Sequence, residues 1–254
     1  MVRGLEHFKK YFEDFADQYV LIGGVACSVV LDGAGLDFRV TKDLDIVLCV
    51  ETLNDDFVSQ FWDYVKSGRY ETRQKSTGKK LFYRFYDPKD KSFPEMLELF
   101  SRKPDALDIG EDSRLTPIPA GEELSSLSAI LLDDEYYALV SQTKTEIDGL
   151  PIVPEHALIP FKAKAWLNLV EQSASGENVD SGDIKKHRND VFRLFRLLAP
   201  ESSFSLPDSI QNDLKTFLNK MVEEEFLNLK DLGYKTIDLE TILGTLKKIY
   251  QIND

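Results

Sequence analysis

The sequence predicts an α+β fold in which a mixed β-sheet flanked by helices precedes a C-terminal helical bundle. Up to residue 153, short runs rich in β-branched and aromatic residues alternate with segments whose apolar residues recur at helical spacing. From residue 154 onward the helical spacing continues throughout. We therefore expect two domains, residues 1–153 with the sheet and residues 154–254 with the helical bundle.

In the first half, the apolar runs and turn signals predict the elements in order. We expect a helix over 4–18, a strand over 19–22, a helix over 25–31, a strand over 43–50 and a helix from Asn54 to about Ser67. Strands over 81–86 and 95–100 and an irregular connection over 101–128 follow. Short strands over 129–132 and 136–140 around the acidic turn 133–135, and a hairpin over 143–153, complete this half.

In the second half, we expect helices over 155–171, 183–199, 207–227 and 239–252. Pro160 lies inside the first of these, so it either kinks that helix or marks its true start.

The composition is that of a soluble globular protein. Of 254 residues, 43% are hydrophobic and 30% are charged, and no run approaches the ~18 continuous apolar residues of a membrane span. The N-terminus lacks the apolar core of a signal peptide. Cys27 and Cys49 both lie in apolar runs, which favours buried, reduced thiols. We expect a cytoplasmic protein with no membrane partner.

The formal net charge of −13 disfavours a broad contact with nucleic acid, because the mean field of the protein repels polyanions. One local exception is the segment 69–84, which has six basic residues and one acidic residue. It is either an RNA-contacting segment or a hairpin edge on which lysines prevent edge-to-edge pairing.

The stretch from Tyr19 to Val50 contains the candidate chemistry. Asp43 and Asp45 stand two residues apart at the start of an apolar strand, so their side chains point to the same face. Two neighbouring carboxylates repel unless a cation lies between them, and hard oxygen ligands suit Mg²⁺. The alternative is a solvated Asp-x-Asp at a strand edge.

Gly23 and Gly24 follow the preceding strand and open a helix. Glycines allow close approach of the backbone to a phosphate chain, and the first N–H groups of a helix favour negative charge. A plain turn is the alternative. Together, the glycine pair and the aspartates predict a site for a metal–nucleoside triphosphate.

The order Gly23, Gly24, Arg39, Thr41, Lys42, Asp43, Asp45 resembles the polymerase-β-type nucleotidyltransferases, in particular the AbiEii-like branch that includes toxins of type IV toxin–antitoxin systems. The 18 residues between Gly24 and Asp43 form a longer spacer than the family has. An extra turn at Asp32-Gly33-Ala34-Gly35 would absorb the difference.

The resemblance implies a nucleotidyltransferase-type sheet with a third carboxylate on a strand beside Asp43 and Asp45. Glu98 is the best match, and Glu95 is its rival. Glu98 would be a further metal ligand or the base that takes the proton of the acceptor hydroxyl; the alternative is a strand glutamate that faces solvent.

The resemblance also implies nucleotide-binding residues. These are Gly23, Gly24, Ser28, Arg39, Lys42, Lys162, Lys186 and Asp190. The match around Lys186 is partial, because His187 and Asn189 depart from the family pattern. Physically, a lysine offsets charge on a pyrophosphate leaving group, and an aspartate holds that lysine in place. A solvated helix face is the alternative for Lys162 and Lys186.

The expected function is therefore the transfer of a nucleoside monophosphate from an NTP to an acceptor hydroxyl, with Mg²⁺ or Mn²⁺ as cofactor. The resemblance implies RNA (tRNA) or a protein as acceptor and a separate antitoxin as partner. A small-molecule, antibiotic-type acceptor is one alternative, and a catalytically silent nucleotide-binding module is another. No Cys/His spacing fits zinc, and no Ser/His/Asp set can be assembled.

Overall fold

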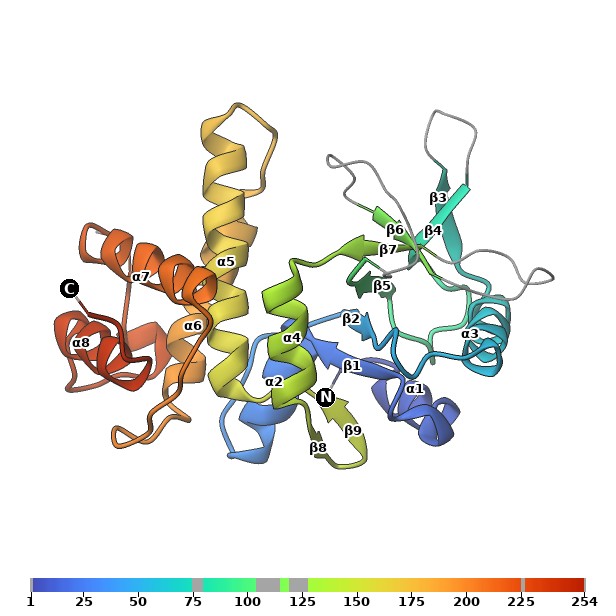
Figure 1. Ribbon diagram of the computed structural model, residues 1–254, viewed down its shortest axis with the longest axis horizontal. Coiled ribbons are helices and arrows are strands. Elements are labelled where there is room, and N and C mark those ends of the chain that lie inside the picture. Colours follow the sequence, from blue (N-terminus) through green and yellow to red (C-terminus); the bar gives the residue numbers. More distant parts are fainter. Residues whose placement is uncertain (1, 75–79, 104–114, 119–127, 225–226, 254) are drawn as a thin grey trace. The chain divides into compact units, whose positions relative to one another are not determined.

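The computed structural model describes residues 2–74, 80–103, 115–118, 128–224 and 227–253. The chain divides into two compact units, Met1–Pro154 and Glu155–Asp254. The first contains the sheet, and the second contains helices (Figure 1).

A mixed sheet organises the first unit. Its described strands run in the order β3-β4-β5-β2-β1-β9-β8, and β7, which pairs with β6, adds to β5. The pairs β2–β5, β1–β9 and β5–β7 are parallel, and the others are antiparallel. The strands are β1 (Tyr19–Ile22), β2 (Asp43–Leu48), β3 (Glu71–Gln74), β4 (Lys80–Tyr86), β5 (Met96–Ser101), β6 (Leu115–Pro117), β7 (Ser128–Leu131), β8 (Thr145–Ile147) and β9 (Leu150–Ile152). The α+β prediction is confirmed.

Helices flank this sheet. They are α1 (Leu5–Tyr11), α2 (Gly23–Gly33), α3 (Asp55–Gly68) and α4 (Asp134–Thr143). Figure 1 shows α1 and α3 side by side, and an aromatic cluster joins them to β1. The members of this cluster, all fully or almost fully buried, are Phe8, Phe12, Tyr19, Phe57, Phe61 and Tyr64. Large aromatic side chains contribute most of the apolar area of such a core.

The helix expected over 4–18 is shorter than predicted. It ends at Tyr11, and a 3-10 turn at Glu13–Phe15 follows. Phe12 lies between the two with φ −114° and contacts Tyr19 and Tyr64. The break in the helix thus accompanies complete burial of Phe12.

The predicted start of α3 is confirmed. The Oδ1 atom of Asn54 accepts a hydrogen bond from the backbone N–H of Phe57 at 2.9 Å. This is the usual N-cap arrangement, which satisfies one of the free donors of the first turn.

The strand predicted over 136–140 is wrong, because these residues belong to α4. Asp133 caps the helix by accepting hydrogen bonds from the N–H groups of Glu135 and Tyr136. Acidic residues in the first turn also favour a helix start through the helix dipole. The acidic cluster is therefore the start of a helix, where we expected a turn between strands.

Two neighbouring predictions hold. The strand over 129–132 corresponds to β7, and the final hairpin is formed by β8 and β9, which turn at Asp148 (φ 50°) and Gly149 (φ 70°). Of the connection 101–128, residues 104–114 and 119–127 lie outside the described residues. The basic segment 69–84 forms the β3–β4 hairpin, with β3 at the edge of the sheet; residues 75–79 lie outside the described part.

The second unit contains α5 (Glu155–Ala174), α6 (Ser181–Phe195), α7 (Asp208–Val222) and α8 (Leu239–Ile249). α5 packs against α6 and α7, where Trp166 meets Phe217 edge to face. Pro160 lies inside α5, so its alternative role as the true start of the helix is wrong. Proline cannot donate to the carbonyl four residues earlier. Here that carbonyl, of His156, accepts a hydrogen bond from the Tyr250 hydroxyl at 2.7 Å.

Within the described part of the chain, none of the helices has the length and apolar character needed to cross a membrane.

Candidate active site

Asp43 and Asp45 lie at the start of β2, between β1 on one side and β5 on the other. Both are half-buried, whereas Leu44 between them is fully buried. The alternation of burial follows the pleat of the strand, so the two carboxylates share one face, as their spacing predicts.

Gly23 brings the start of α2 against Asp45. Ile22, the last residue of β1, is the register partner of Asp45, and Gly23 follows it with φ +67°. A Cβ atom on Gly23 would lie 1.7 Å from Oδ2 of Asp45. Only glycine leaves room for this carboxylate and adopts this backbone conformation without strain.

Gly24 makes a second close approach. A Cβ atom there would lie 2.5 Å from Oγ1 of Thr41 and 3.4 Å from Nη2 of Arg39. The segment that precedes β2 therefore passes directly beside the start of α2. No side chain caps this helix through its N-cap residue, Ile22. The N–H groups of the first turn of a helix, next to a guanidinium and a hydroxyl, are suited to bind an anion such as a phosphate.

Glu98 lies beside Asp45 in the sheet. The two residues are register partners on the parallel strands β5 and β2, so their side chains project from the same face. Glu98 is 9% exposed and so does not point to solvent. On its other side, Arg84 of β4 is its register partner, and Arg84 Nε donates to Glu98 Oε1 at 2.6 Å. Nη2 of Arg84 donates to the same oxygen.

The rival Glu95 has a different environment. It precedes β5 and is about one-third exposed, and its carboxylate pairs with Lys42 at 3.2 Å and with Arg3 at 4.0 Å. Of the two glutamates, Glu98 is therefore the one buried beside Asp45. The resemblance assigns Lys42 to nucleotide binding. In the structure, its ammonium group forms an ion pair with the carboxylate of Glu95.

The donor set fits a divalent metal held by two carboxylates. Asp43 and Asp45 supply hard oxygen ligands, and Mg²⁺ commonly binds one or two protein carboxylates while water and substrate phosphates complete its shell. A three-carboxylate cage is not assembled: in the residues that the structure describes, no group of three or more His, Cys, Asp and Glu side chains is arranged to hold a metal.

Ser28 lies one turn further along α2. It is buried, and its hydroxyl donates to Oδ2 of Asp32 at 3.3 Å. The hydroxyl thus donates to a residue further toward the C-terminal end of α2. The start of this helix is at Gly23 and Gly24.

The second unit joins two of the predicted residues. Lys162 of α5 and Asp190 of α6 form a buried ion pair at 3.3 Å, with side chains 3% and 0% exposed. Arg193 adds a second contact to Asp190 at 3.2 Å. Lys186 pairs with Asp183 at 3.2 Å on the surface instead. The two charges are buried together, and either charge alone would be costly to bury.

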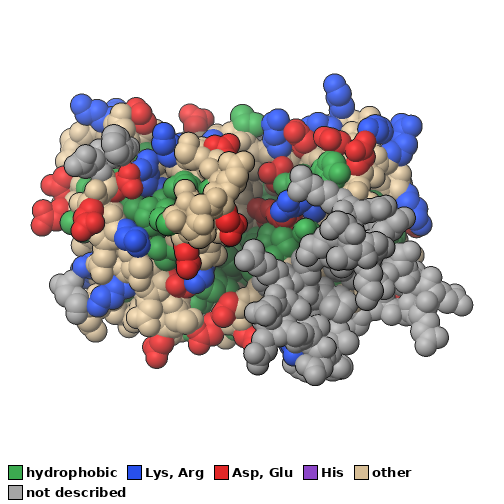
Figure 2. All heavy atoms as spheres, turned by 90° about the horizontal axis from the view of Figure 1, so that it is seen from above, with side chains coloured by type: hydrophobic (Ala, Val, Ile, Leu, Met, Phe, Trp, Pro, Cys, Tyr) green, Lys and Arg blue, Asp and Glu red, His purple; other side chains and the backbone are tan. Residues whose placement is uncertain are grey.

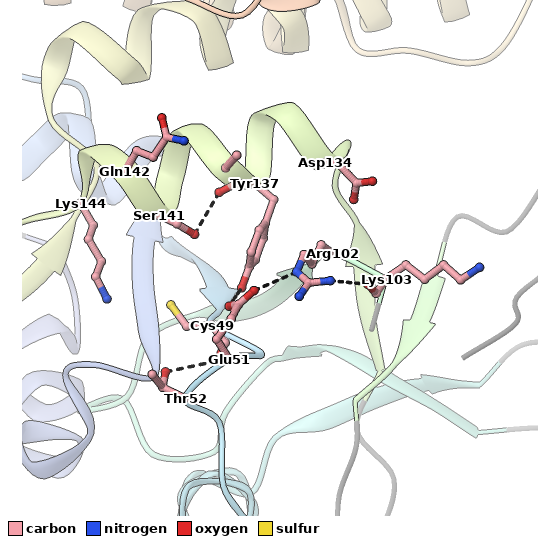
Figure 3. Close-up of a pocket in the computed structure, with 11 residues that line it drawn as sticks. Cys49, Glu51, Thr52, Arg102, Lys103, Asp134, Tyr137, Ser141, Gln142 and Lys144 are labelled. Atoms are coloured by element: carbon pink, nitrogen blue, oxygen red, sulfur yellow. Dashed lines mark hydrogen bonds and ion pairs between the residues drawn. The ribbon is translucent and has the colours of Figure 1, made fainter. Parts of the chain in front are cut away.

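A pocket of about 740 Å³ opens at the other end of β2 (Figure 3). In it, Glu51 accepts hydrogen bonds from Arg102 (2.9 Å) and from the hydroxyl of Tyr137 (2.5 Å). Cys49 also lines it, and burial raises the pKa of that thiol to about 11, so the thiol is neutral near pH 7. No sequence motif marks this pocket, since its residues come from segments far apart in the chain.

The charge on the surface is mixed. On the face shown in Figure 2, Lys and Arg side chains are interspersed with Asp and Glu side chains.

Comparison with known proteins gives structural likeness without sequence likeness. No protein-family model matches the chain, and no curated protein matches it in sequence. The structure of JHP933 from Helicobacter pylori is similar over 98% of this chain and 90% of that one, with 16% identity and a TM-score of 0.41. A second H. pylori structure, provisionally assigned as a nucleotidyltransferase, is similar over 98% and 92%, with 16% identity and a TM-score of 0.40. The Megavirus polyadenylate synthase is similar over 88% of this chain and 36% of that one, with 11% identity and a TM-score of 0.37.

Proposed function

We propose that this chain is a metal-dependent nucleotidyltransferase that moves a nucleoside monophosphate from an NTP to an acceptor hydroxyl. The observation that carries the proposal is the packing of Gly23 against Oδ2 of Asp45. That contact puts a strand-borne carboxylate pair beside the start of a helix, with Arg39 and Thr41 next to Gly24. The same few residues therefore offer ligands for a metal and donors for a phosphate chain.

In this proposal Asp43 and Asp45 hold the metal, Mg²⁺ or Mn²⁺. When bound, the metal polarises the phosphate oxygens and neutralises charge that develops on them. Gly23 and Gly24 let the backbone approach the triphosphate, and Arg39 stabilises the charge on its tail. Glu98 accepts the proton of the acceptor hydroxyl, because it is the third carboxylate on the face shared with Asp45.

The finer assignment follows the AbiEii-like resemblance. We propose an acceptor hydroxyl on RNA (tRNA) or on a protein, and a cognate antitoxin as partner. Ser28, Lys42, Lys162, Lys186 and Asp190 stay predicted nucleotide-binding residues. A small cationic acceptor, such as an antibiotic, is the second candidate, and the net charge of −13 favours it because an acidic protein attracts cations.

The test is incubation with each α-labelled NTP, Mg²⁺ and either total RNA or cell lysate. The wild-type protein is compared with the variant Asp43→Ala/Asp45→Ala. We expect label in one acceptor class only with the wild-type protein. Loss of an outer-shell metal partner commonly costs 10–100-fold, so removing both direct ligands is expected to lower transfer by more than about 100-fold.

The matched control is Glu146→Gln, which removes an exposed carboxylate on β8 and should leave transfer unchanged. If the aspartate variant transfers label as well as the wild-type protein does, the proposed metal site is refuted. If no acceptor is labelled and NTP binding is also unaffected in that variant, a silent nucleotide-binding module replaces the proposal.

A further inference from the structure

Glu98 lies between an acid and a base in the sheet. Its strand, β5, has β2 with Asp45 on one side and β4 with Arg84 on the other. Both neighbours are in direct register with Glu98, but only Arg84 has a charge that attracts its carboxylate, since two carboxylates repel each other. Arg84 binds it through Nε at 2.6 Å and through Nη2, and both nitrogens donate to the same oxygen, Oε1.

The carboxylates of Asp45 and Glu98 contact groups on opposite sides of the pair. Oδ2 of Asp45 is packed against Gly23, which follows β1, and Oε1 of Glu98 is bound by Arg84 on β4. In the order β4-β5-β2-β1, these two partners lie on opposite sides of the Asp45–Glu98 pair. Within the described residues, Asp43, Asp45 and Glu98 accordingly do not form a group of three side chains arranged to hold a metal.

The Arg84–Glu98 contact is strong for physical reasons. It joins a guanidinium to a carboxylate, and charge-assisted hydrogen bonds are roughly twice as strong as neutral ones. The Glu98 side chain is 11% exposed and that of Arg84 is 33% exposed, so water screens the pair only in part. Removing the arginine alone would leave a buried carboxylate without a counter-charge, and a divalent cation would then be attracted to it.

We propose that Arg84 withholds Glu98 from the metal in the nucleotide-free protein, so that Asp43 and Asp45 alone form the resting metal site. Arg84 is a positioning residue that acts through Glu98. This inference rests on the proposed nucleotidyltransferase function, because it concerns the same metal site. Of the two roles that the resemblance implies for Glu98, metal ligand and base, it removes the first from the resting protein.

The experiment measures Mn²⁺ binding to the full chain without nucleotide, by electron paramagnetic resonance and by calorimetry. We expect Asp45→Asn to weaken binding by at least about 10-fold, and Glu98→Gln to change it by less than about two-fold. Arg84→Gln releases Glu98. We therefore expect Mn²⁺ binding to tighten by at least about five-fold, or a second ion to bind. A change of about five-fold is within the usual coupling energy of contacting residues.

Two further variants test whether Arg84 acts through Glu98. In the double variant Arg84→Gln/Glu98→Gln, the tightening should disappear, because the released carboxylate is gone. Arg84→Lys keeps a positive charge next to Glu98 and should restore wild-type binding. The matched control is Arg102→Gln, which breaks a similar arginine–glutamate pair at the other end of β2 (2.9 Å to Glu51) and should not alter Mn²⁺ binding.

The outcomes separate this inference from the proposed function. If Asp45→Asn weakens binding but Glu98→Gln weakens it equally, Glu98 is already a ligand and only the inference is overturned. The inference also fails if Arg84→Gln is folded by circular dichroism and binds Mn²⁺ as the wild-type protein does. Unchanged binding in Asp45→Asn would overturn both. Should Arg84→Gln not fold, the comparison of Glu98→Gln with Asp45→Asn decides the question.

Discussion

Two constraints act on Gly23. Its backbone is left-handed, and its missing Cβ leaves the space in which the Asp45 carboxylate lies. The first constraint affects the stability of the protein, because a residue with a Cβ needs about 1–2 kcal/mol to adopt this conformation. The second affects the geometry of the carboxylate, since 1.7 Å is far below any real contact distance.

The substitution Gly23→Ala separates these effects when it is paired with Gly35→Ala. Gly35 also has a left-handed backbone (φ +68°), but no atom lies within 4 Å of its Cβ position. Gly35→Ala should lower the unfolding free energy in urea titrations by about 1–2 kcal/mol, and Gly23→Ala should lower it by at least as much. Only Gly23→Ala should also weaken Mn²⁺ binding, by at least about 10-fold, because the Asp45 carboxylate has to move. Equal Mn²⁺ affinities in the two variants would contradict the packing argument.

The sequence predicted part of this site at the level of residues. The two-residue spacing of Asp43 and Asp45 predicted their common face, because the period of a strand is 2. The pairing of Glu98 with Arg84 was not predictable in the same way. Arg84 is 14 residues away in the chain, and its partner depends on the register of β4 against β5. Register is set by turn geometry and by the buried face of the whole hairpin, which a local pattern does not reveal.

At the scale of elements, the spacing of apolar residues and the presence of helix-capping residues decided which predictions succeeded. Asn54 predicted the start of α3 because a cap is a local interaction. The strand predicted over 136–140 failed because a short apolar run fits either a buried strand or one turn of helix, and length or caps must arbitrate. Asp133 was the available signal, since its carboxylate caps α4.

The helix α5 continues through Pro160. The carbonyl of His156, to which proline has no N–H to donate, accepts a hydrogen bond from a residue outside this helix. Tyr250 supplies that hydrogen bond from its hydroxyl to His156 O, and burial raises the pKa of Tyr250, so the hydroxyl keeps its proton. The variant Tyr250→Phe should therefore lower the unfolding free energy by about 1–3 kcal/mol, the usual cost of an unsatisfied buried acceptor.

The background Pro160→Ala makes this prediction specific. Alanine restores an N–H group that can donate to His156 O, so Tyr250→Phe should cost much less in that background. Urea titrations of the four proteins in this double-mutant cycle measure the coupling. A cost that is the same in both backgrounds would mean that the hydroxyl has no role in supporting the helix through its proline.

At the scale of the whole molecule, charge limits which acceptor the proposed transferase can use. A net charge of −13 repels RNA at long range, so an RNA acceptor has to be held by a local set of cations. The segment 69–84 is the candidate that the sequence offers, with Lys75, Lys79 and Lys80 at its centre. A small cationic acceptor would instead be attracted by the acidic protein as a whole.

The triple substitution of Lys75, Lys79 and Lys80 by Gln distinguishes these acceptors. If RNA is the acceptor, KM for RNA should rise while KM for the NTP stays constant, and the slope of log affinity against log salt should become shallower by about 0.7 for each phosphate that these lysines neutralise in the wild-type protein. The control replaces Lys215, Lys220 and Lys235 by Gln, which changes the net charge equally but leaves the segment intact. Equal effects of the two triple variants would show that only total charge matters. If neither triple variant has an effect and KM for the acceptor rises with salt, the cationic acceptor is favoured, because screening weakens its attraction to the acidic protein.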